Sequence, residues 1–330
     1  MSRAKKIAIA VIAAVVALLI VVDVAASSYL VNYAIGRAGD GGDRNVEEVV
    51  FVEGEGTEAR IEAERAAQAA KTAEFLEQVP GTEVEITADD GVRLSGVVYE
   101  HEGDDNRWAL VIHGYRDSNE TAYVLDMARH YYDAGFNVLT PDLRALGDSD
   151  GDYVGMGWLD RLDILDWVDW IVAQDADAQI VIHGVSMGAA TTMMVSGEET
   201  PAAVKVFVED CGYTSVWDVF SAELSRRFGL PEFPLLHSAS ALSSVMAGYS
   251  FEEASALEAV ARSTKPMLFI HGTADDFIPF DMVNQLFEAK TTGDKEMLVS
   301  EGAGHADAMY ELSDAYWETV FNFVDRYITQ

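Results

Sequence analysis

The stretch Ile180-Val181-Ile182-His183-Gly184-Val185-Ser186-Met187-Gly188 decides the fold. Its first part is an unbroken run of β-branched residues, which is typical of a strand buried on both faces of a sheet. Its second part is a G-x-S-x-G motif, and the small and apolar residues that follow it indicate a helix opening at Met187. A serine on such a sharp strand-to-helix turn is forced out above the sheet. The motif therefore predicts that Ser186 is a nucleophile.

Similar apolar runs occur on both sides of this stretch, and two of them also end in His-Gly. The predicted strands are 109–112, 136–140, 180–184, 204–208, 267–270 and 296–300, preceded by a hairpin between Val84 and Tyr99. Helical patterns lie between them at 120–134, 158–173, 189–196 and 281–289. This alternation predicts an α/β class protein with a doubly wound, mostly parallel sheet. Ligands of such sheets collect at the carboxyl ends of the strands.

A serine hydroxyl is a weak nucleophile, so Ser186 needs a histidine base and an acid that orients the histidine. Only three of the seven histidines follow Ser186, namely His237, His271 and His305. His271 belongs to a repeated strand-end pair and His237 to a helical insertion, which favours structural roles for both. His305 stands in a glycine-rich loop after the last predicted strand and is the expected base. The acid is expected just beyond Ile270, where Asp275 and Asp276 are adjacent.

The backbone N–H of Met187 follows the nucleophile and is one expected donor to the oxyanion of the tetrahedral intermediate. A second donor is expected from the loop that follows the strand ending at Ile112. No cofactor motif accompanies this machinery, because the sequence has no glycine-rich phosphate loop after a strand. The acidic segment 148–152 lacks the glycine and glutamate that a calcium loop requires at positions six and twelve. We therefore expect neither a cofactor nor a metal.

Residues 84–325 resemble the α/β-hydrolase serine enzymes. The motif H-G-x-x-D-x-x-[IV]-P spans His271–Pro279, and Asp142–Ser149 is similar to the family's D-x-R-G-x-G-x-S loop, with Ala145 in place of the usual glycine. The resemblance implies that Asp275 is the acid, with Glu209 and Asp210 at the alternative position that some members use. It also implies that the backbone of Tyr115 is the second oxyanion donor. Arg144 is expected to clamp its loop.

The segments 157–163 and 210–215 are similar to the membrane-anchored bacterial branch often labelled serine-aminopeptidase-like or dienelactone-hydrolase-like. This resemblance implies a carboxylesterase-like serine hydrolase that cleaves carboxylic esters or related acyl compounds through an acyl-enzyme. An aminopeptidase, an amidase or a thioesterase would use the same machinery. A non-catalytic surface binding module is the alternative from another class, and an intact triad argues against it.

The composition limits partners and location. The 330 residues carry 22 Lys and Arg against 56 Asp and Glu, a formal net charge of −34. Nucleic acid is therefore excluded as a partner, because binding phosphates needs a basic surface. The negative field also disfavours anionic substrates. A single cysteine, Cys211, excludes an internal disulfide and a cysteine zinc cluster.

The N-terminus carries Arg3, Lys5 and Lys6 before an apolar run from Ile7 to Val22. Residues 1–30 are therefore expected to form a signal anchor or signal peptide, with the catalytic domain outside the cytoplasm. Small residues at 24–26 would permit cleavage and secretion. A tether and surface helix are expected at 31–80, with glycines at 39–43 and the helix at 57–79, before a hydrolase domain at 81–330. Within it, the insertion 213–264 has helical patterns at 216–228, 239–246 and 251–262 and is expected to form a partial lid with an apolar lining, which includes Trp217, Phe220, Phe228, Phe233 and Tyr249.

Overall fold

The computed structural model describes residues 1–37, 57–103 and 106–329. An eight-stranded sheet has the order β1-β2-β4-β3-β5-β6-β7-β8. The hairpin β1–β2 pairs antiparallel, as does β2 with β4, and every other pair is parallel. The strands are β1 Thr82–Thr87, β2 Arg93–Tyr99, β3 Arg107–Ile112, β4 Asn137–Pro141, β5 Gln179–Val185, β6 Val204–Asp210, β7 Met267–Gly272 and β8 Lys295–Ser300. The predicted mostly parallel α/β sheet is confirmed.

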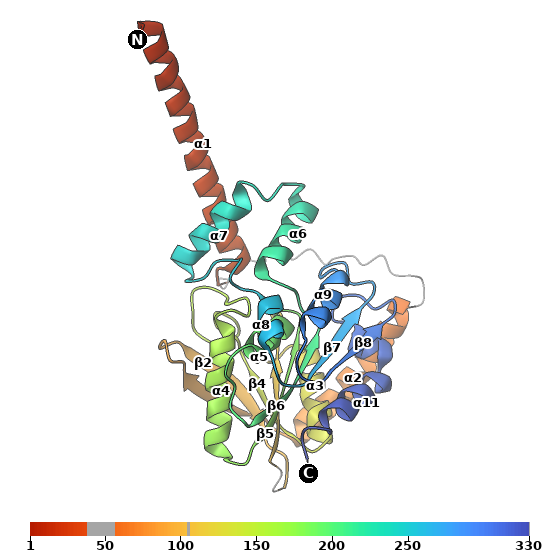
Figure 1. Cartoon of the computed structure of the whole chain (residues 1–330). Helices are drawn as coiled ribbons and strands as arrows, with labels where there is room; N and C mark the ends of the chain where they lie inside the picture. The colour runs from red at the N-terminus through yellow and green to blue at the C-terminus, as the bar shows by residue number, and fades with distance from the viewer. Residues whose placement is uncertain (38–56, 104–105, 330) are drawn as a thin grey trace.

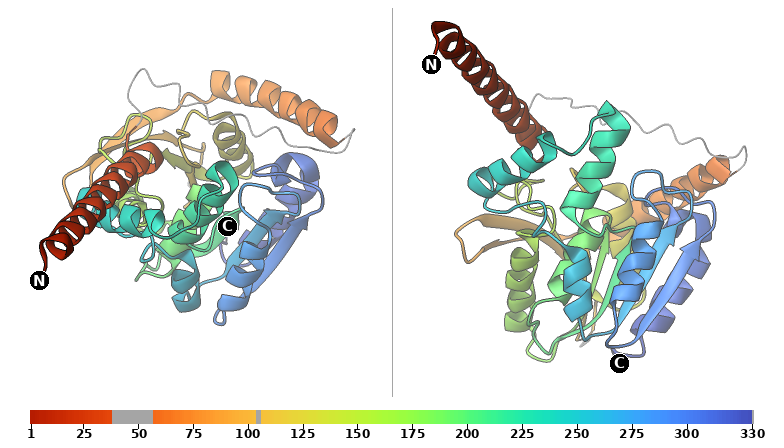
Figure 2. Two further views of the ribbon diagram at one scale, coloured as in Figure 1. Left: turned by 90° about the horizontal axis from the view of Figure 1, so that it is seen from above. Right: turned by 45° about the horizontal axis from the view of Figure 1, so that its top comes forward.

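Helices cover both faces of this sheet (Figures 1 and 2). The helices of the body are α2 Thr57–Gln78, α3 Ala122–Asp133, α4 Asp160–Gln174, α5 Met187–Ser196, α6 Val216–Phe228, α7 Leu235–Met246, α8 Ala256–Arg262, α9 Asp281–Ala289, α10 Ala308–Leu312 and α11 Asp314–Val324. One core joins α4, α5, α8 and α9 to one sheet face, and a second joins α2, α3, α10 and α11 to the other. Within β3, Leu110 belongs to the first core and Val111 to the second. This alternation explains why apolar residues follow one another without interruption from Trp108 to Ile112 of β3.

The lid segment differs from its predicted boundaries in two places. Helix α7 begins at Leu235, four residues earlier than predicted, while α8 begins only at Ala256. The hydroxyl of Ser255 accepts a hydrogen bond from the backbone N–H of Glu258 and caps α8, so Phe251 lies before the helix, buried in the core. Hydrophobic periodicity alone extended the predicted helix back to Phe251, because a buried loop residue looks like a helical core residue in sequence.

Helix α1 spans Arg3–Ile35 and projects away from the body beside α7 (Figure 1). Its most apolar 18-residue window has a mean hydropathy of 3.1 and none of it is buried. The helix is thus long and apolar enough to cross a membrane, a property that anchors share with signal sequences. It also continues five residues beyond the predicted boundary at residue 30. The glycine-rich stretch 39–43, predicted as a tether, lies outside the described residues.

Candidate active site

Ser186 lies on the sharp turn between β5 and α5, with a left-handed φ of +57°. The two glycines of the motif make this turn possible. A Cβ at Gly184 would lie 2.0 Å from the carbonyl oxygen of Gly188, and a Cβ at Gly188 would lie 2.2 Å from that of Ile112. Both positions therefore exclude any larger residue. The turn holds the Ser186 hydroxyl at the carboxyl edge of the sheet, beside the N-terminus of α5.

His305 follows β8 in a loop and contacts both expected partners. Its Nε2 lies 2.8 Å from the Ser186 Oγ, and its Nδ1 lies 2.7 Å from the Asp275 Oδ2. An ionised carboxylate can only accept hydrogen bonds, so Nδ1 carries a proton and Nε2 accepts the hydrogen bond of the serine hydroxyl. The ring of Phe277 packs on the imidazole, with ring centroids 5.0 Å apart. The imidazole is thereby held in the tautomer that a general base requires.

The Asp275 carboxylate is fully buried and saturated with donors. Its Oδ1 accepts hydrogen bonds from the backbone N–H groups of Phe277 and Ile278, at 2.9 and 2.8 Å. Burial raises the pKa of Asp275, but the charge of His305 and the hydrogen bonds to the carboxylate outweigh it and hold the pKa well below its usual range. Asp276 is exposed to solvent. Of the two adjacent aspartates, the structure brings Asp275 to the imidazole.

His271 is a partner of this carboxylate that the sequence did not identify. Its Nε2 lies 2.9 Å from the carbonyl oxygen of Ile278 and 3.3 Å from the Asp275 Oδ2. The side chain is fully buried at the end of β7. The His-Gly pair marks only a strand end in sequence. The contact between the two side chains depends on how the following loop folds back, which no residue pattern reports.

The alternative acids, Glu209 and Asp210, accept hydrogen bonds from groups other than the imidazole of His305. Asp210 accepts a hydrogen bond from the hydroxyl of Tyr316 at 2.8 Å, and Glu209 accepts one from the backbone N–H of Gly212 at 3.0 Å. Burial raises the pKa of Glu209 to about 8 and that of Asp210 to about 6. Both side chains therefore hold the loops of the site in place.

Within the described part of the chain, Cys211, Asp275 and His305 are close enough to share a metal ion, with ligand atoms within 4.8 Å of one another. The chemistry of this set does not favour a metal. Both ring nitrogens of His305 already contact Ser186 and Asp275. Burial raises the pKa of the Cys211 thiol well above its usual value, which keeps the sulfur protonated.

The two backbone groups expected to hold an oxyanion flank the serine. Met187 is the first residue of α5 and follows Ser186 directly. Tyr115 follows Gly114, whose own backbone N–H donates to the hydroxyl of Tyr123 at 2.6 Å. Tyr115, Ser186 and Met187 line the same pocket. The loop after β3 and the start of α5 therefore both contribute to the wall of the pocket that contains Ser186.

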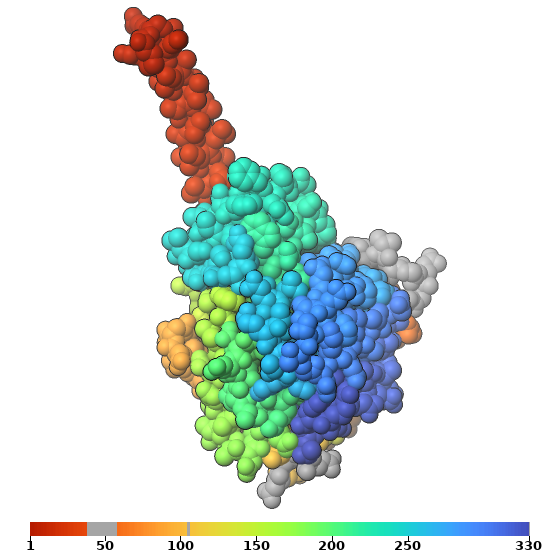
Figure 3. Space-filling model, viewed as in Figure 1, coloured from red at the N-terminus to blue at the C-terminus, as the bar shows by residue number. Residues whose placement is uncertain are grey.

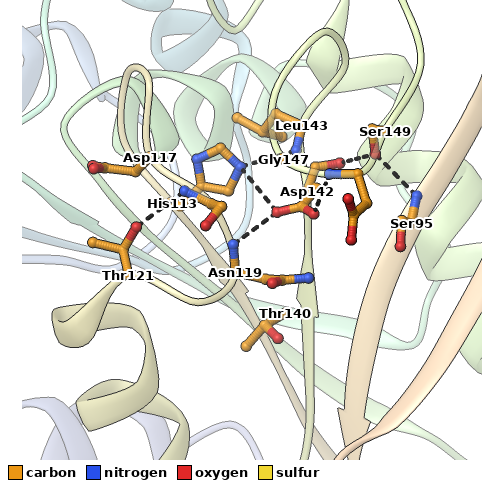
Figure 4. A network of polar contacts seen from close by, with 12 residues as sticks. Ser95, His113, Asp117, Asn119, Thr121, Thr140, Asp142, Leu143, Gly147 and Ser149 are labelled. Carbon is orange, nitrogen blue, oxygen red and sulfur yellow. Dashed lines mark hydrogen bonds and ion pairs between the residues drawn. The ribbon is translucent and has the colours of Figure 1, made fainter. Parts of the chain in front are cut away.

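A buried polar network fixes the loop after β3 (Figure 4). The backbone N–H of Leu143 donates to the Nε2 of His113 at 3.0 Å, while the Nδ1 of His113 donates to the carbonyl of Gly114 at 2.8 Å. The carboxylate of Asp142 accepts from the backbone N–H of Asn119 at 2.7 Å. Burial lowers the pKa of His113, so it stays neutral. The strand ends β3 and β4 are thereby joined into one rigid frame around residues 113–119.

Arg144 holds the neighbouring loop, as expected. Its guanidinium donates through Nε to Asp163 at 2.7 Å and through another nitrogen to Asp90 at 3.0 Å. Ala145, which replaces the usual glycine, adopts a left-handed φ of +60°. The loop thus keeps the glycine-type backbone without the glycine.

A pocket with a cavity volume of about 140 Å³ contains Ser186 in its lining. Phe220 and Phe228 of the lid line the pocket, as predicted. Phe233 and Tyr249 do not: Phe233 is 73% exposed, and Tyr249 is buried with its hydroxyl donating to the carbonyl of Val154. Trp217 packs edge-on against His237. The other lining residues are mainly apolar: Leu30, Tyr33, Ala34, Tyr115, Arg116, Met156, Met187, Tyr213, Val219, Glu223, Leu224, Arg227, Leu236, Ala239, Phe251 and Phe277. Three of these belong to α1, which the sequence did not predict.

Known proteins share both the sequence pattern and the fold. The chain is 29% identical to the uncharacterized protein YqkD of Bacillus subtilis over 258 residues, covering 77% of this chain and 82% of that protein. The Pyrococcus furiosus esterase Pf2001 has a similar structure, with a TM-score of 0.63 and 23% identity over 76% of this chain and 94% of its own. The Pyrococcus horikoshii acylaminoacyl peptidase matches with a TM-score of 0.59 and 14% identity, covering 76% of this chain and 42% of its own.

The two solved structures are too distant in sequence to show more than a shared fold. The family assignment rests on a match between residues 109–319 and the model of the alpha/beta hydrolase family. This range begins within β3 and contains the G-x-S-x-G turn and the loop that carries His305. The chain therefore belongs to the alpha/beta hydrolase family of enzymes.

Proposed function

We propose that this protein is a serine hydrolase that cleaves carboxylic esters or related acyl compounds, with Ser186, His305 and Asp275 as its catalytic triad. The observation that carries the proposal is the position of His305, whose two ring nitrogens contact Ser186 at 2.8 Å and Asp275 at 2.7 Å. This is the geometry in which a histidine takes the serine proton while a carboxylate steadies the imidazolium. The family membership supports hydrolysis as the reaction class.

In the proposed reaction, Ser186 Oγ attacks the acyl carbonyl and its proton passes to His305 Nε2. The backbone N–H groups of Met187 and Tyr115 stabilise the oxyanion of the tetrahedral intermediate. His305 then gives the proton to the leaving alcohol as the carbon–oxygen bond breaks. His305 then takes a proton from a water molecule whose oxygen attacks the acyl carbon. It returns this proton to Ser186 Oγ as the bond between the acyl carbon and Oγ breaks and the acid leaves.

An amide or aminopeptidase activity uses the same steps on a poorer leaving group. An aminopeptidase also needs a carboxylate that binds the α-ammonium group of its substrate. Glu223 lines the pocket, but its carboxylate already pairs with Arg226 and Arg227. The rest of the lining is mainly apolar, which favours an acyl or aryl group over a charged one. We therefore place esters first and aminoacyl substrates second.

We propose that α1 remains as a membrane anchor with the hydrolase domain outside the cytoplasm. Arg3, Lys5 and Lys6 precede the apolar stretch, and cytoplasmic flanks are enriched in such cations. The hydroxyl of Ser238 donates to the carboxylate of Asp23 at 2.5 Å. Cleavage at residues 24–26 would remove Asp23 and with it this contact between α1 and α7. Protease protection of intact cells or spheroplasts tests this orientation. Digestion of the domain from the outer side is expected, and its protection would contradict the proposal.

The catalytic proposal is tested by comparing wild type with Ser186→Ala on 4-nitrophenyl butyrate and on an aminoacyl 4-nitroanilide. Ser244→Ala is a matched control, because Ser244 is an exposed serine of α7 outside the triad. Wild type and the control should hydrolyse the ester, with Ser186→Ala slower by a factor of about 10⁴ or more. Equal rates for wild type and Ser186→Ala would contradict the triad. Faster cleavage of the nitroanilide would favour the aminopeptidase instead.

A further inference from the structure

Helix α1 has two parts with different surroundings. From Arg3 to Val22 every residue is exposed, whereas from Asp23 to Ile35 one face is covered by the body. The buried residues Ser27, Val31 and Ile35 recur every four positions, as on one face of a helix. The hydroxyl of Ser27 donates to the carbonyl of Leu235 at the start of α7. The second part of α1 is therefore docked against the lid.

The docked part of α1 is also a wall of the active-site pocket. Leu30, Tyr33 and Ala34 line the pocket together with Ser186. The hydroxyl of Tyr115 donates to the carbonyl of Ala34, and the guanidinium of Arg116 donates to the carbonyl of Tyr33 at 2.6 Å. The helix that carries the membrane-length apolar stretch thus reaches the loop beside the catalytic serine.

The length of the exposed part of α1 indicates which residue would lie at the surface of a bilayer. The sixteen apolar residues from Ile7 to Val22 rise about 24 Å as a helix, and the long side chains of Lys5 and Lys6 can extend to the far surface of a hydrocarbon core about 30 Å thick. Asp23 would then lie at the membrane surface, and Asp23 is the residue that contacts Ser238 of α7. Figures 1 and 3 show α1 leaving the body from beside the lid, so the lid faces the same side as the projecting helix.

The lid surface on that side is unusually apolar for this acidic chain. Among the described residues that follow α1, five large hydrophobic side chains are exposed, and Leu162 is the only one of these outside the lid. The other four are Phe228, Leu230, Phe233 and Val245, with exposures of 53%, 44%, 73% and 83%. Residues 224–247 contain one acid, Glu232, against two arginines, and α7 has no acidic or basic residue besides His237. Such a surface beside a membrane-length helix fits a lipid interface.

The pocket opens onto this lid surface. Phe228 lines the pocket and is also half exposed at the end of α6. The same pocket contains Ser186 and is lined by Leu30 of α1, Leu224 of α6 and Leu236 of α7. An acyl chain can therefore pass from the membrane surface to the nucleophile without crossing the acidic outer surface of the domain.

We propose that the substrate is a bilayer-resident acyl ester with an uncharged head group, which enters the pocket from the membrane between α1 and the lid. This inference rests on the proposed esterase function of Ser186 and adds the source and class of the substrate. The apolar lining of the pocket selects the long acyl chain. The net charge of −34 disfavours anionic lipids, so the head group is neutral, as in an acylglycerol.

The test uses the full chain in phosphatidylcholine vesicles that carry monooleoylglycerol, with 4-nitrophenyl butyrate as the soluble ester. The variants are Phe233→Asp and Val245→Asp, alone and combined, since neither residue lines the pocket. Leu162→Asp is the matched control, because Leu162 is an exposed leucine of α4 and does not belong to the lid. The combined lid variant should hydrolyse monooleoylglycerol about tenfold more slowly or worse, because charges replace side chains that enter the lipid interface. Its rate on the soluble ester should stay within about twofold of wild type, as should both rates of the control.

The outcomes separate this inference from the proposed function. A wild type that cleaves the soluble ester but not monooleoylglycerol in vesicles would overturn the inference and leave the function intact, and this comparison needs no variant. Equal losses on both substrates in the lid variants, or no loss on either, would also overturn it. A separate result would contradict the proposed function itself: Ser186→Ala would hydrolyse the soluble ester as fast as wild type.

Discussion

The hydroxyl of Tyr115 donates a hydrogen bond to the backbone carbonyl of Ala34, which joins α1 to the loop that follows β3. Tyr115 is also the residue whose backbone N–H is proposed to hold the oxyanion. The apolar helix is therefore part of the pocket and not a separate appendage. A substitution on the docked face of α1 should therefore change how the pocket binds its substrate.

Ala34→Trp should shorten the pocket from the α1 side. Ala34 lines the pocket, and an indole there would fill space that a long acyl chain occupies. We expect kcat/KM for 4-nitrophenyl decanoate to fall about tenfold or more relative to that for the acetate, because several buried methylene contacts are lost. Val24→Trp places the same side chain on an exposed position of α1 and should leave the ratio unchanged. An unchanged ratio in Ala34→Trp would show that α1 does not bound the acyl site.

Asp275→Asn should remove most activity while preserving the shape of the site. The amide oxygen would take the place of Oδ1, which accepts the backbone N–H groups of Phe277 and Ile278, so the amide NH2 would face the Nδ1 of His305. This favours the tautomer with the proton on Nε2, which cannot accept the serine proton. We expect kcat on 4-nitrophenyl butyrate to fall by about 10⁴-fold. The adjacent exposed Asp276→Asn is the matched control and should stay within about twofold of wild type. Similar losses in the two variants would undo the choice of acid.

Gly188→Ala should damage both folding and activity. Its Cβ would lie 2.2 Å from the carbonyl oxygen of Ile112, so α5 must move away from β3. We expect the free energy of unfolding to fall by about 1–3 kcal/mol, as for an overpacked core. A Cβ at Gly103 would lie 3.8 Å from the Nδ1 of His101, an ordinary van der Waals contact, so Gly103→Ala should be neutral. Urea unfolding of both variants measures the difference, and a neutral Gly188→Ala would contradict the close packing at the turn.

Glu209 should make the protein less stable as the pH rises. Burial raises its pKa in the folded state to about 8 from 4.5, so the folded state holds a proton that the unfolded state releases above pH 4.5. The contribution is fully present below pH 4.5 and is lost as the pH rises towards 8, with a slope of about 1.4 kcal/mol per pH unit. Glu209→Gln keeps the acceptor for Gly212 and removes the titration. Its stability advantage over wild type should therefore grow between pH 5 and pH 8, and a constant difference would contradict the assignment.

Much of the fold could be predicted because each strand carries its own signal. Uninterrupted apolar runs located the parallel strands, and the predicted helix 281–289 agrees with α9 at both ends. Ser186, His305 and the loop of Asp275 could be found because a strand-to-helix serine turn and strand-end loops have recognisable residue patterns. The choice between Asp275 and Asp276 needed the family resemblance, since adjacent aspartates differ only in the direction their side chains take.

The docked face of α1 could not be predicted for a physical reason. A helix face is recognised by the contrast between apolar and polar positions, and α1 is apolar almost throughout. The docked face also includes Ser27, which is buried although a serine in a sequence usually indicates an exposed position. The contact between His271 and Asp275 was hidden for a related reason, since it depends on the path of a loop. Both features arise from tertiary contacts that no local pattern encodes.

The central claim is that Ser186 is the nucleophile, activated by His305. Its most direct measurement is labelling of the purified full-length protein with a fluorophosphonate, followed by mass spectrometry of the modified peptide. One adduct on Ser186 is expected, absent in Ser186→Ala and formed at least about 10³-fold more slowly in His305→Ala. No adduct on the wild type, or one on a different residue, would contradict the claim.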